Sequence, residues 1–387
     1  MKKVLIVDFC NYEDYPIGGY LSFVKNLMES FGDELALVGI TTDVDDPIGH
    51  WFKKLINGSL YDFFAIARYD KLKTKHVVPD RLVFFLLIKF YKKRILKIDI
   101  KNIFIQRPEA ILSLVDKNAQ NICFCFAGLE NPLSISKYKY VGSFANLFEK
   151  YFFKKLKYVK TILASGDEDA INEMILRSDG KILSGSVKKF PTRINIDIYK
   201  PLNKVEVRKT LNMSADTTII ITTGRLALLK GWRFMIDCFF LFQKKIPDSL
   251  FYFIGEGEDL RDIQDYITLK NLDEKVILAG KMKSDEIAQF LNAADLFIMG
   301  SFKEGWSTSL SESIACGIPS CVTKFSSANE IIQDGNNGYV IENRNTNLFV
   351  ERMFDAIKLS KPVYNENVKA LASNKLKDDF LKVWNLQ

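Results

Sequence analysis

Short apolar runs alternate along this chain with longer segments of helical periodicity, and this alternation restricts the fold more than any other feature. In the second half the expected strands are 218–222, 250–254, 276–279, 296–299 and 320–322, and the expected helices are 232–243, 260–268, 285–293 and 308–316. A spacing of roughly 25 to 30 residues per strand–helix unit is typical of a doubly wound parallel sheet covered on both faces. We therefore predict an α/β fold.

The first half repeats this pattern less regularly. Its expected strands are 4–9, 35–40, 103–105, 122–126 and 161–164, with a helix at 20–30. Two prolines flank a short run in KFPTRINIDIYKP (Lys189–Pro201), which is typical of a connection between domains. Because 387 residues exceed what one core usually supports, we predict domains at 1–195 and 196–366. A last helix is expected at 368–384.

Composition limits the class of protein. Hydrophobic residues make up 48% and charged residues 26%, as in folded globular proteins. The six cysteines lie mostly in apolar stretches without metal-ligand spacing, so we expect buried free thiols in a reducing compartment. The first apolar run ends at Asp8 and no run reaches the about 20 residues that span a bilayer. We expect a cytoplasmic protein or one peripheral to the inner face of the cell membrane.

The net charge of +7 is unevenly distributed. Between Trp51 and Lys160, Lys and Arg outnumber Asp and Glu by more than two to one. Within this region RLVFFLLIKFYKKRILK (Arg81–Lys97) is either a buried helix with a cationic end or a surface that docks on anionic lipid headgroups. No recognised nucleic-acid-binding motif is present, so nucleic acid is not an expected partner.

Two glycines follow the first expected strand. Gly18 and Gly19 lack Cβ atoms, so a phosphate can approach their backbone, and the next helix offers its positive N-terminus. The same residues also suit a plain strand-to-helix turn, and both interpretations stay open.

Two cations follow the expected strand at 218–222. Arg225 and Lys230 lie in TTGRLALLKGW, at the carboxyl end of that strand, where doubly wound folds bind ligands. They would repel each other unless an anion lay between them, and a diphosphate suits a planar arginine and a lysine. The alternative is a solvated basic loop.

The segment EGWSTSLSE pairs Glu304, in a loop, with Glu312, about one turn inside the helix expected from Thr308. Ser307 and Thr308 are capping candidates, and the helix start offers backbone N–H groups to an anion. The two carboxylates can accept hydrogen bonds from sugar hydroxyls. A helix cap with two incidental glutamates is the alternative.

Five pieces of the second half together resemble a known family. GRLALLKGW, FIGEGEDLR, LAGKMKSDEIAQFLNAADLFI, EGWSTSLSESIACGIPSCVT and NEIIQDGNNGYVI resemble, in order and spacing, the nucleotide-binding domain of family-4 (GT4) glycosyltransferases, retaining enzymes of the GT-B fold. PIGGYLSFVKNL resembles the family's N-terminal glycine loop. The resemblance implies two Rossmann-like doubly wound domains facing a central cleft. Residues 1–195 would bind the acceptor, 196–366 the nucleotide sugar, and 367–387 would return to the first domain.

The resemblance also implies roles for single residues. Arg225 and Lys230 would hold the donor diphosphate, Glu304 would contact the transferred sugar, and Glu312 would bind the ribose hydroxyls. Lys281 and Met282 would lie by the nucleotide base. The donor-binding residues that it implies, besides Glu312, are Gly18, Gly19, Gly224, Met282, Gly305, Trp306, Ser307, Thr308 and Ser309.

The sequence departs from the family pattern at two positions. Ser307 stands where the family often has a second glycine, and Ala127, in FAGLENP, stands where many relatives have a histidine. His50 and His76 fall in no matching motif. Glu130 is the candidate to take over part of the acceptor-side role.

Fixed cations and a helix start can stabilise a leaving diphosphate without a metal, so neither metal nor cofactor is expected. Asp43–Val44–Asp45 and Asp167–Glu168–Asp169 match the spaced aspartates of metal-dependent transferases, but such triplets are common by chance. The expected activity is transfer of a hexose, with retention, from a nucleotide-diphosphate sugar to a glycan or lipid-linked acceptor, as in lipopolysaccharide O-antigen or capsule synthesis. The alternatives are an epimerase or phosphorylase of the same fold, and a catalytically inactive membrane-surface binding protein.

Overall fold

The structure is a computed structural model that describes residues 3–16, 18–70, 78–116, 121–126, 129, 131, 145–363 and 366–386. The chain divides into two compact units. Unit 1 comprises 1–191 and 374–387, and unit 2 comprises 192–373. The α/β class with two parallel sheets, predicted from the alternation of strands and helices, is confirmed.

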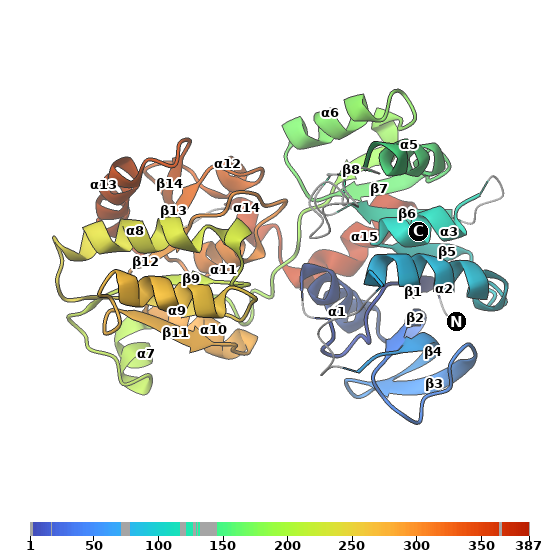
Figure 1. Cartoon of the computed structure of the whole chain (residues 1–387), viewed down its shortest axis with the longest axis horizontal. Helices are drawn as coiled ribbons and strands as arrows, with labels where there is room; N and C mark the ends of the chain where they lie inside the picture. Colours follow the sequence, from blue (N-terminus) through green and yellow to red (C-terminus); the bar gives the residue numbers. More distant parts are fainter. Residues whose placement is uncertain are drawn as a thin grey trace. The chain divides into compact units, whose positions relative to one another are not determined.

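Within its described residues, unit 1 has one sheet with the strand order β3-β4-β2-β1-β5-β6-β7-β8 (Figure 1). The strands are β1 (Val4–Val7), β2 (Leu35–Thr41), β3 (Trp51–Ile56), β4 (Ser59–Arg68), β5 (Asn102–Ile105), β6 (Asn121–Phe126), β7 (Thr161–Ala164) and β8 (Val187–Lys189). All pairings are parallel except that of β3 with β4. The chain adds strands first on one side of β1 and then, from β5, on the other. The switch point of unit 1 therefore lies between the carboxyl ends of β1 and β5.

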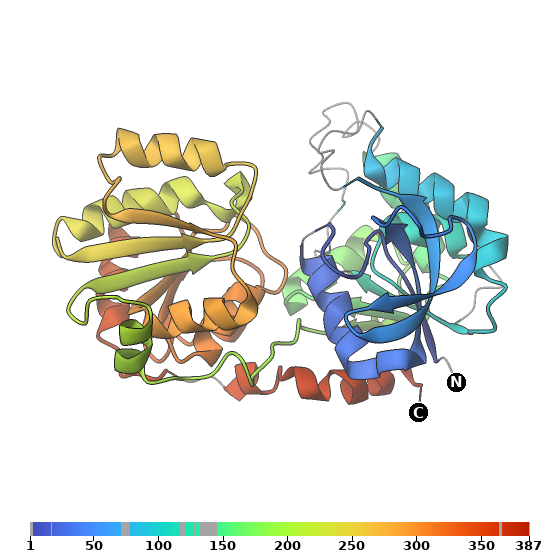
Figure 2. The same ribbon diagram turned by 90° about the horizontal axis from the view of Figure 1, so that it is seen from below.

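Helices cover both faces of this sheet (Figure 2). They are α1 (Gly19–Phe31), α2 (Asp80–Ile95), α3 (Pro108–Leu114), α5 (Ala145–Leu156), α6 (Glu168–Arg177) and α15 (Leu376–Trp384). α2, α3, α5 and α6 share one core cluster, and α1 and α15 share the other. On α1, Leu21, Val24, Leu27 and Met28 recur at three- and four-residue spacing, which places them on one buried face.

Two parts of unit 1 differ from the sequence prediction. The antiparallel pair β3–β4 was not predicted, although its turn is Asn57–Gly58, both with positive φ, the strongest short hairpin signal. The single helix predicted at 368–384 is wrong. The segment forms α14 (Glu366–Lys369), a 3-10 turn (Ser373–Lys375) and α15. Between the helices, Ile194 N donates to Leu371 O and Ser373 N donates to Ile194 O, and this bridge interrupts the helix.

Unit 2 has a parallel sheet in the order β11-β10-β9-β12-β13-β14. Its strands are β9 (Thr218–Thr223), β10 (Ser249–Ile254), β11 (Val276–Gly280), β12 (Leu296–Met299), β13 (Ser320–Thr323) and β14 (Gly338–Ile341). Its helices are α7 (Lys204–Thr210), α8 (Trp232–Gln243), α9 (Leu260–Leu269), α10 (Ser284–Ala293), α11 (Thr308–Ala315), α12 (Ala328–Ile331), α13 (Thr346–Ile357) and α14. Every strand and helix predicted between 218 and 322 is present, with ends that differ by a residue or two.

Two smaller predictions concern side chains. All six cysteines are buried and free, as predicted. In the aspartate triplet at 167–169, Asp167 caps α6 by accepting a hydrogen bond from Ala170 N. In the other triplet Asp43 accepts a hydrogen bond from Arg68 through its backbone carbonyl. Both triplets therefore have structural contacts of their own.

Candidate functional site

The switch point of unit 2 lies where β9 and β12 run side by side. The chain leaves β9 toward β10 and β11 on one side, and leaves β12 toward β13 and β14 on the other. A small pocket opens at the carboxyl ends, and its lining includes Gly224, Arg225, Lys230 and Ser301. Open α/β sheets bind ligands at this position.

Two glycines let the loops at this edge approach each other. Gly231 has φ 69°, and a Cβ there would lie 1.8 Å from Gly300 O. Gly255 has φ 146°, and a Cβ there would lie 1.9 Å from Gly224 O. Any side chain would push these loops apart. The loop after β9 is therefore in close contact with the loop after β12 at Gly231 and with the loop after β10 at Gly224.

Lys230 and Glu304 form the centre of the candidate site. Lys230 Nζ lies 2.5 Å from Glu304 Oε1, and Ser301 Oγ donates to the same oxygen at 2.7 Å. Glu304 is mostly buried, while Lys230 is partly exposed. The structure thus joins the basic loop after β9 to the acidic loop after β12.

Arg225 has a partner that the sequence analysis did not identify. Its Nε donates to Glu258 Oε2 at 2.9 Å, and both side chains are accessible to water. The two cations expected to share an anion therefore each have a carboxylate partner. Glu258 lies in FIGEGEDLR, next to Gly257, and only its place in that motif could have indicated it.

The start of α11 lies beside the end of β9, because a Cβ on Gly224 would be 3.6 Å from Ser309 Oγ. Ser307 is the N-cap, and its hydroxyl accepts from Leu310 N at 3.3 Å. The Ser307 N–H, expected to face the donor, already donates to Ser327 Oγ at 3.1 Å. Thr308 and Ser309 begin the helix, where N–H groups lack intrahelical acceptors. The neighbouring Gly305 and Trp306 are half-buried.

Glu312 faces a second residue that was not predicted, Tyr199. The Tyr199 hydroxyl donates to the Glu312 carboxylate. Burial raises the pKa of Glu312 to about 8, and the hydrogen bond from Tyr199 acts in the opposite direction. Near pH 7 this carboxyl group is therefore largely protonated. Tyr199 lies in the segment that joins the units, for which the sequence suggested only a connection.

The remaining predicted residues are dispersed. Met282 follows β11 and packs against the same core cluster as Tyr199. Gly18 is the N-cap and Gly19 the first residue of α1 in unit 1, so their contact with a donor stays a prediction. Ala127 and Glu130 lie outside the described residues, as does His76.

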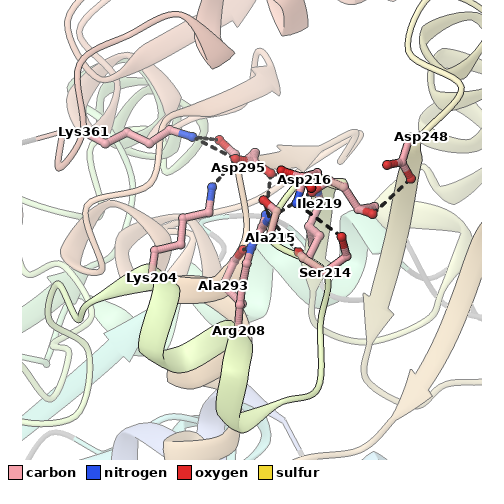
Figure 3. Close-up of polar contacts among 11 residues, drawn as sticks. Lys204, Arg208, Ser214, Ala215, Asp216, Ile219, Asp248, Ala293, Asp295 and Lys361 are labelled. Atoms are coloured by element: carbon pink, nitrogen blue, oxygen red, sulfur yellow. Dashed lines mark hydrogen bonds and ion pairs between the residues drawn. The ribbon is translucent and has the colours of Figure 1, made fainter.

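Two charged residues, Arg344 and Asp295, form hydrogen bonds at the two ends of β12. Arg344 Nη2 donates to Gly300 O at 2.7 Å, and its guanidinium lies 3.5 Å from the centre of the Phe302 ring. At the other end of β12, Asp295 accepts from Ile219 N at 2.8 Å and from Arg208 Nη2 at 2.7 Å. Figure 3 shows Lys204 and Lys361 reaching the same carboxylate. β12 is therefore anchored at both ends.

Unit 1 has a polar cluster at its own switch point, and the sequence analysis missed it. Asp8, directly after β1, is fully buried. Its Oδ1 accepts from Arg107 Nε and its Oδ2 from Gln106 Nε2, both at 2.7 Å. The Arg107 guanidinium lies 4.2 Å from the centre of the Tyr20 ring, in the first turn of α1. These residues are far apart in sequence and form no motif.

Glu109 and Arg81 extend this cluster. Arg81, in the first turn of α2, lies 3.7 Å from Glu109 Oε1. Burial raises the pKa of Glu109, while Arg81 and Arg107 oppose the rise. The unit 1 cluster, Asp8, Tyr20, Arg81, Gln106, Arg107 and Glu109, thus places two guanidinium groups near one buried carboxylate and one buried carboxyl group.

Comparison with known proteins supports this picture of the fold. Residues 203–375 match the family model "Glycosyl transferases group 1". Sucrose-phosphate synthase of Thermosynechococcus elongatus superposes over 100% of both chains, with a TM-score of 0.77 and 15% identity. HepE of Anabaena, in complex with UDP-glucose, covers 99% of this chain and 100% of its own, with a TM-score of 0.67 and 15% identity. Identities this low show the fold alone.

Among curated proteins, one relative is the "UDP-Gal:alpha-D-GlcNAc-diphosphoundecaprenol alpha-1,3-galactosyltransferase" of Escherichia coli. It is 24% identical over 172 residues, 43% of this chain and 44% of that protein. The chain spans about half the length of the curated relatives it matches. The family match at residues 203–375 includes both Lys230 and Glu304. The protein therefore has the GT-B fold, and its residues 203–375 are similar to the group 1 glycosyl transferases.

Proposed function

We propose that this protein transfers a hexose from a nucleotide-diphosphate sugar to a glycan or lipid-linked acceptor. The observation that carries the proposal is the Lys230–Glu304 pair at the carboxyl ends of β9 and β12, beside the start of α11. A cation and helix N–H groups suit a diphosphate, and a carboxylate suits sugar hydroxyls. The names of the E. coli galactosyltransferase and of the HepE complex, both with UDP-sugars, support this class of donor.

In this proposal the cations and the helix start act together on the diphosphate. Lys230 and the N–H groups of Thr308 and Ser309 bind the diphosphate and stabilise the charge that grows as its bond to the anomeric carbon breaks. Arg225 leaves Glu258 and joins them. The acceptor oxygen bonds to that carbon from the face that the diphosphate leaves, its proton passes to the diphosphate, and the configuration is retained. These fixed charges suffice without a metal, so chelators should leave the rate unchanged.

The acceptor side of the proposal uses the unit 1 cluster. Arg107 presents a planar guanidinium that suits phosphate oxygens, as in a lipid diphosphate. Support for a lipid-linked acceptor in surface polysaccharide synthesis comes from the name of the E. coli relative, whose acceptor carries a diphosphoundecaprenol. Support for retention comes from the family resemblance.

The first test is a thermal-shift panel with UDP, GDP, ADP and dTDP, without metal. A ligand at 100 times its Kd adds about 2.7 kcal/mol of stability. We expect one nucleotide to stabilise the wild type and Lys270→Met, but not Lys230→Met. Lys270 is a fitting control because it pairs with Asp237 on a different edge of unit 2. If no nucleotide or nucleotide sugar stabilises the wild type, or if Lys230→Met responds normally, the proposal fails.

The matching nucleotide sugar should then be incubated with the protein alone. Conversion of the sugar to its epimer without an acceptor would favour an epimerase instead. Transfer to an added acceptor, with the product configuration determined by NMR, would support the proposal.

A further inference from the structure

Helix α2 has two faces of different character. Phe84, Ile88 and Ile95 are buried in the core of unit 1. Leu82, Leu86 and Phe90 recur every four residues and are exposed, Phe90 by 74%. Both sequence interpretations of 81–97 therefore apply, each to one side of the helix. Leu82, Leu86 and Phe90 thus form an apolar stripe on the exposed side of the helix. The core of unit 1 is contacted by the opposite side, so these three side chains do not contribute to it.

Helix α5 exposes apolar side chains on the same side of the sheet. Leu147 and Tyr151 are exposed, while Phe152 and Phe153 are buried in the core cluster that α2 also joins. α3 packs against both helices and lies between them. The outer sides of α2 and α5 consequently belong to one helical layer of unit 1 (Figure 1).

The charge around these apolar side chains is predominantly positive. Residues 81–97 contain six Lys and Arg and no Asp or Glu, and residues 145–160 contain five Lys and one Glu. Lys89, Lys93, Lys150 and Lys154 are exposed on the two helices. Such a mixture of aliphatic, aromatic and basic side chains is typical of surfaces that lie in the interface of an anionic bilayer.

We propose that this α2–α5 face, with Leu82, Leu86, Phe90, Leu147 and Tyr151 and the four exposed lysines, docks on a bilayer that contains anionic lipids. The apolar side chains enter the headgroup region, and the lysines pair with lipid phosphates. In this proposal the two helices lie along the surface of the bilayer. Among the residues that the structure describes, none of the helices has the length and apolar character of a membrane span. Docking does not depend on the proposed transfer reaction, although Arg81 links α2 to the unit 1 cluster.

The test is co-sedimentation of the full chain with vesicles of phosphatidylcholine alone, or of equal parts phosphatidylcholine and phosphatidylglycerol. The wild type should bind the anionic vesicles, more weakly as salt rises, and not the neutral ones. Leu86→Ser/Phe90→Ser and Lys89→Glu/Lys93→Glu should each weaken partitioning by about tenfold or more, since each loses two contacts of the kind that hold proteins at this interface.

Matched controls lie in unit 2. Leu269→Ser/Leu348→Ser removes two exposed leucines, and Lys209→Glu/Lys244→Glu reverses two exposed lysines. Both should bind vesicles like the wild type. Nucleotide thermal shifts on all variants show that they are folded, and they separate failure of docking from failure of the proposed transferase.

Three results of the sedimentation assay, and one of light scattering, would overturn the docking proposal. The first is no binding to anionic vesicles, and the second is equal binding to neutral ones. The third is that the α2 variants bind as well as the controls do. Light scattering completes the test: a wild-type dimer that Leu86→Ser/Phe90→Ser converts to a monomer would assign the face to a second copy of the chain.

Discussion

The two switch points of the molecule hold their charges in different ways. In unit 2 the Lys230–Glu304 pair joins two loops, and Lys230 remains partly exposed. In unit 1 Asp8 is fully buried, and its two oxygens are held by Gln106 and Arg107. Both positions lie at the carboxyl ends of parallel strands, so the difference does not come from the fold.

The difference indicates what each position can do. A partly exposed lysine can turn from its carboxylate to a ligand phosphate, because the ligand replaces the lost partner of Lys230 and Ser301 still donates to Glu304. A buried carboxylate cannot lose its arginine without leaving an unpaired buried charge. We therefore expect changes at the unit 2 switch point to affect activity, and changes to Asp8 to affect stability.

The largest expected effect is that of Asp8→Asn. Arg107 would keep its charge without a buried counter-ion, which lowers the free energy of unfolding by about 3–5 kcal/mol. Urea denaturation measures the loss. Asp62→Asn, which breaks an accessible pair with Lys53, should cost less than about 1 kcal/mol. Equal losses for the two variants would remove the distinction between the buried and the accessible pair.

The next effect is that of Lys230→Met on the proposed reaction. Loss of one group that stabilises the leaving diphosphate should lower kcat by about 100- to 1000-fold. The free energy of unfolding should fall less than in Asp8→Asn, because Lys230 is partly exposed and Ser301 still donates to Glu304. Steady-state kinetics and denaturation of the same preparation test both statements. A stable variant with unchanged kcat would show that Lys230 is not in the reaction path.

A smaller effect concerns pH and Glu312. If ribose hydroxyls donate to this carboxylate, binding favours its ionised form and lowers its pKa from about 8. Nucleotide affinity should then rise by at most about tenfold per pH unit up to about pH 8 and level off above it. Calorimetry in two buffers should detect proton release on binding. Glu312→Gln should bind with no such pH dependence.

The same shift has a predictable sign in the protein without ligand. Folding favours protonated Glu312, so this stabilisation is complete below the pKa of the unfolded chain, about 4.3, and is lost as the pH rises through about 8. The free energy of unfolding of Glu312→Gln should therefore depend less on pH than that of the wild type over this range. An identical dependence would place the titrating group elsewhere.

The smallest effect is expected for Arg344→Lys. Lysine keeps the charge but loses the fork that reaches Gly300 O and the flat contact with Phe302. The loop that carries Glu304 should loosen and lower kcat by about threefold to tenfold, equivalent to about 1 kcal/mol. Arg352→Lys, in a surface pair with Asp355, is the control. Equal kinetics for the two variants would limit Arg344 to packing.

The sequence was most informative where structure follows from local patterns and from the expected order of the strands. The strands and helices of unit 2 follow from local periodicity, and Lys230 and Glu304 follow strands that the topology makes neighbours. The unit 1 cluster draws Asp8, Tyr20, Arg81 and Arg107 from separate elements, so no short pattern contains it. Tyr199 and Glu258 were not predicted for the same reason, because their partners Glu312 and Arg225 are distant in sequence.

The Asn57–Gly58 hairpin and the interrupted tail were missed for other reasons. The hairpin has a local signal, the Asn57–Gly58 turn, and its prediction needs no tertiary information. The tail has helical periodicity throughout, but the backbone of Leu371 and Ser373 pairs with Ile194, nearly the length of unit 2 away in sequence. Tertiary pairing therefore overrode local propensity.

The packing of α15 has a consequence for the order in which the chain matures on the ribosome. Phe380 contacts the rings of Phe31, Phe104 and Phe190 in unit 1. Residues 376–384 emerge from the ribosome only after all of unit 2 has been synthesised. Until then the three rings of unit 1 lack their contact with α15. Unit 2 is a continuous stretch of chain, so it can form its core without residues from unit 1. The unit that is synthesised first is therefore expected to finish folding last, and chaperones would meet it in that interval.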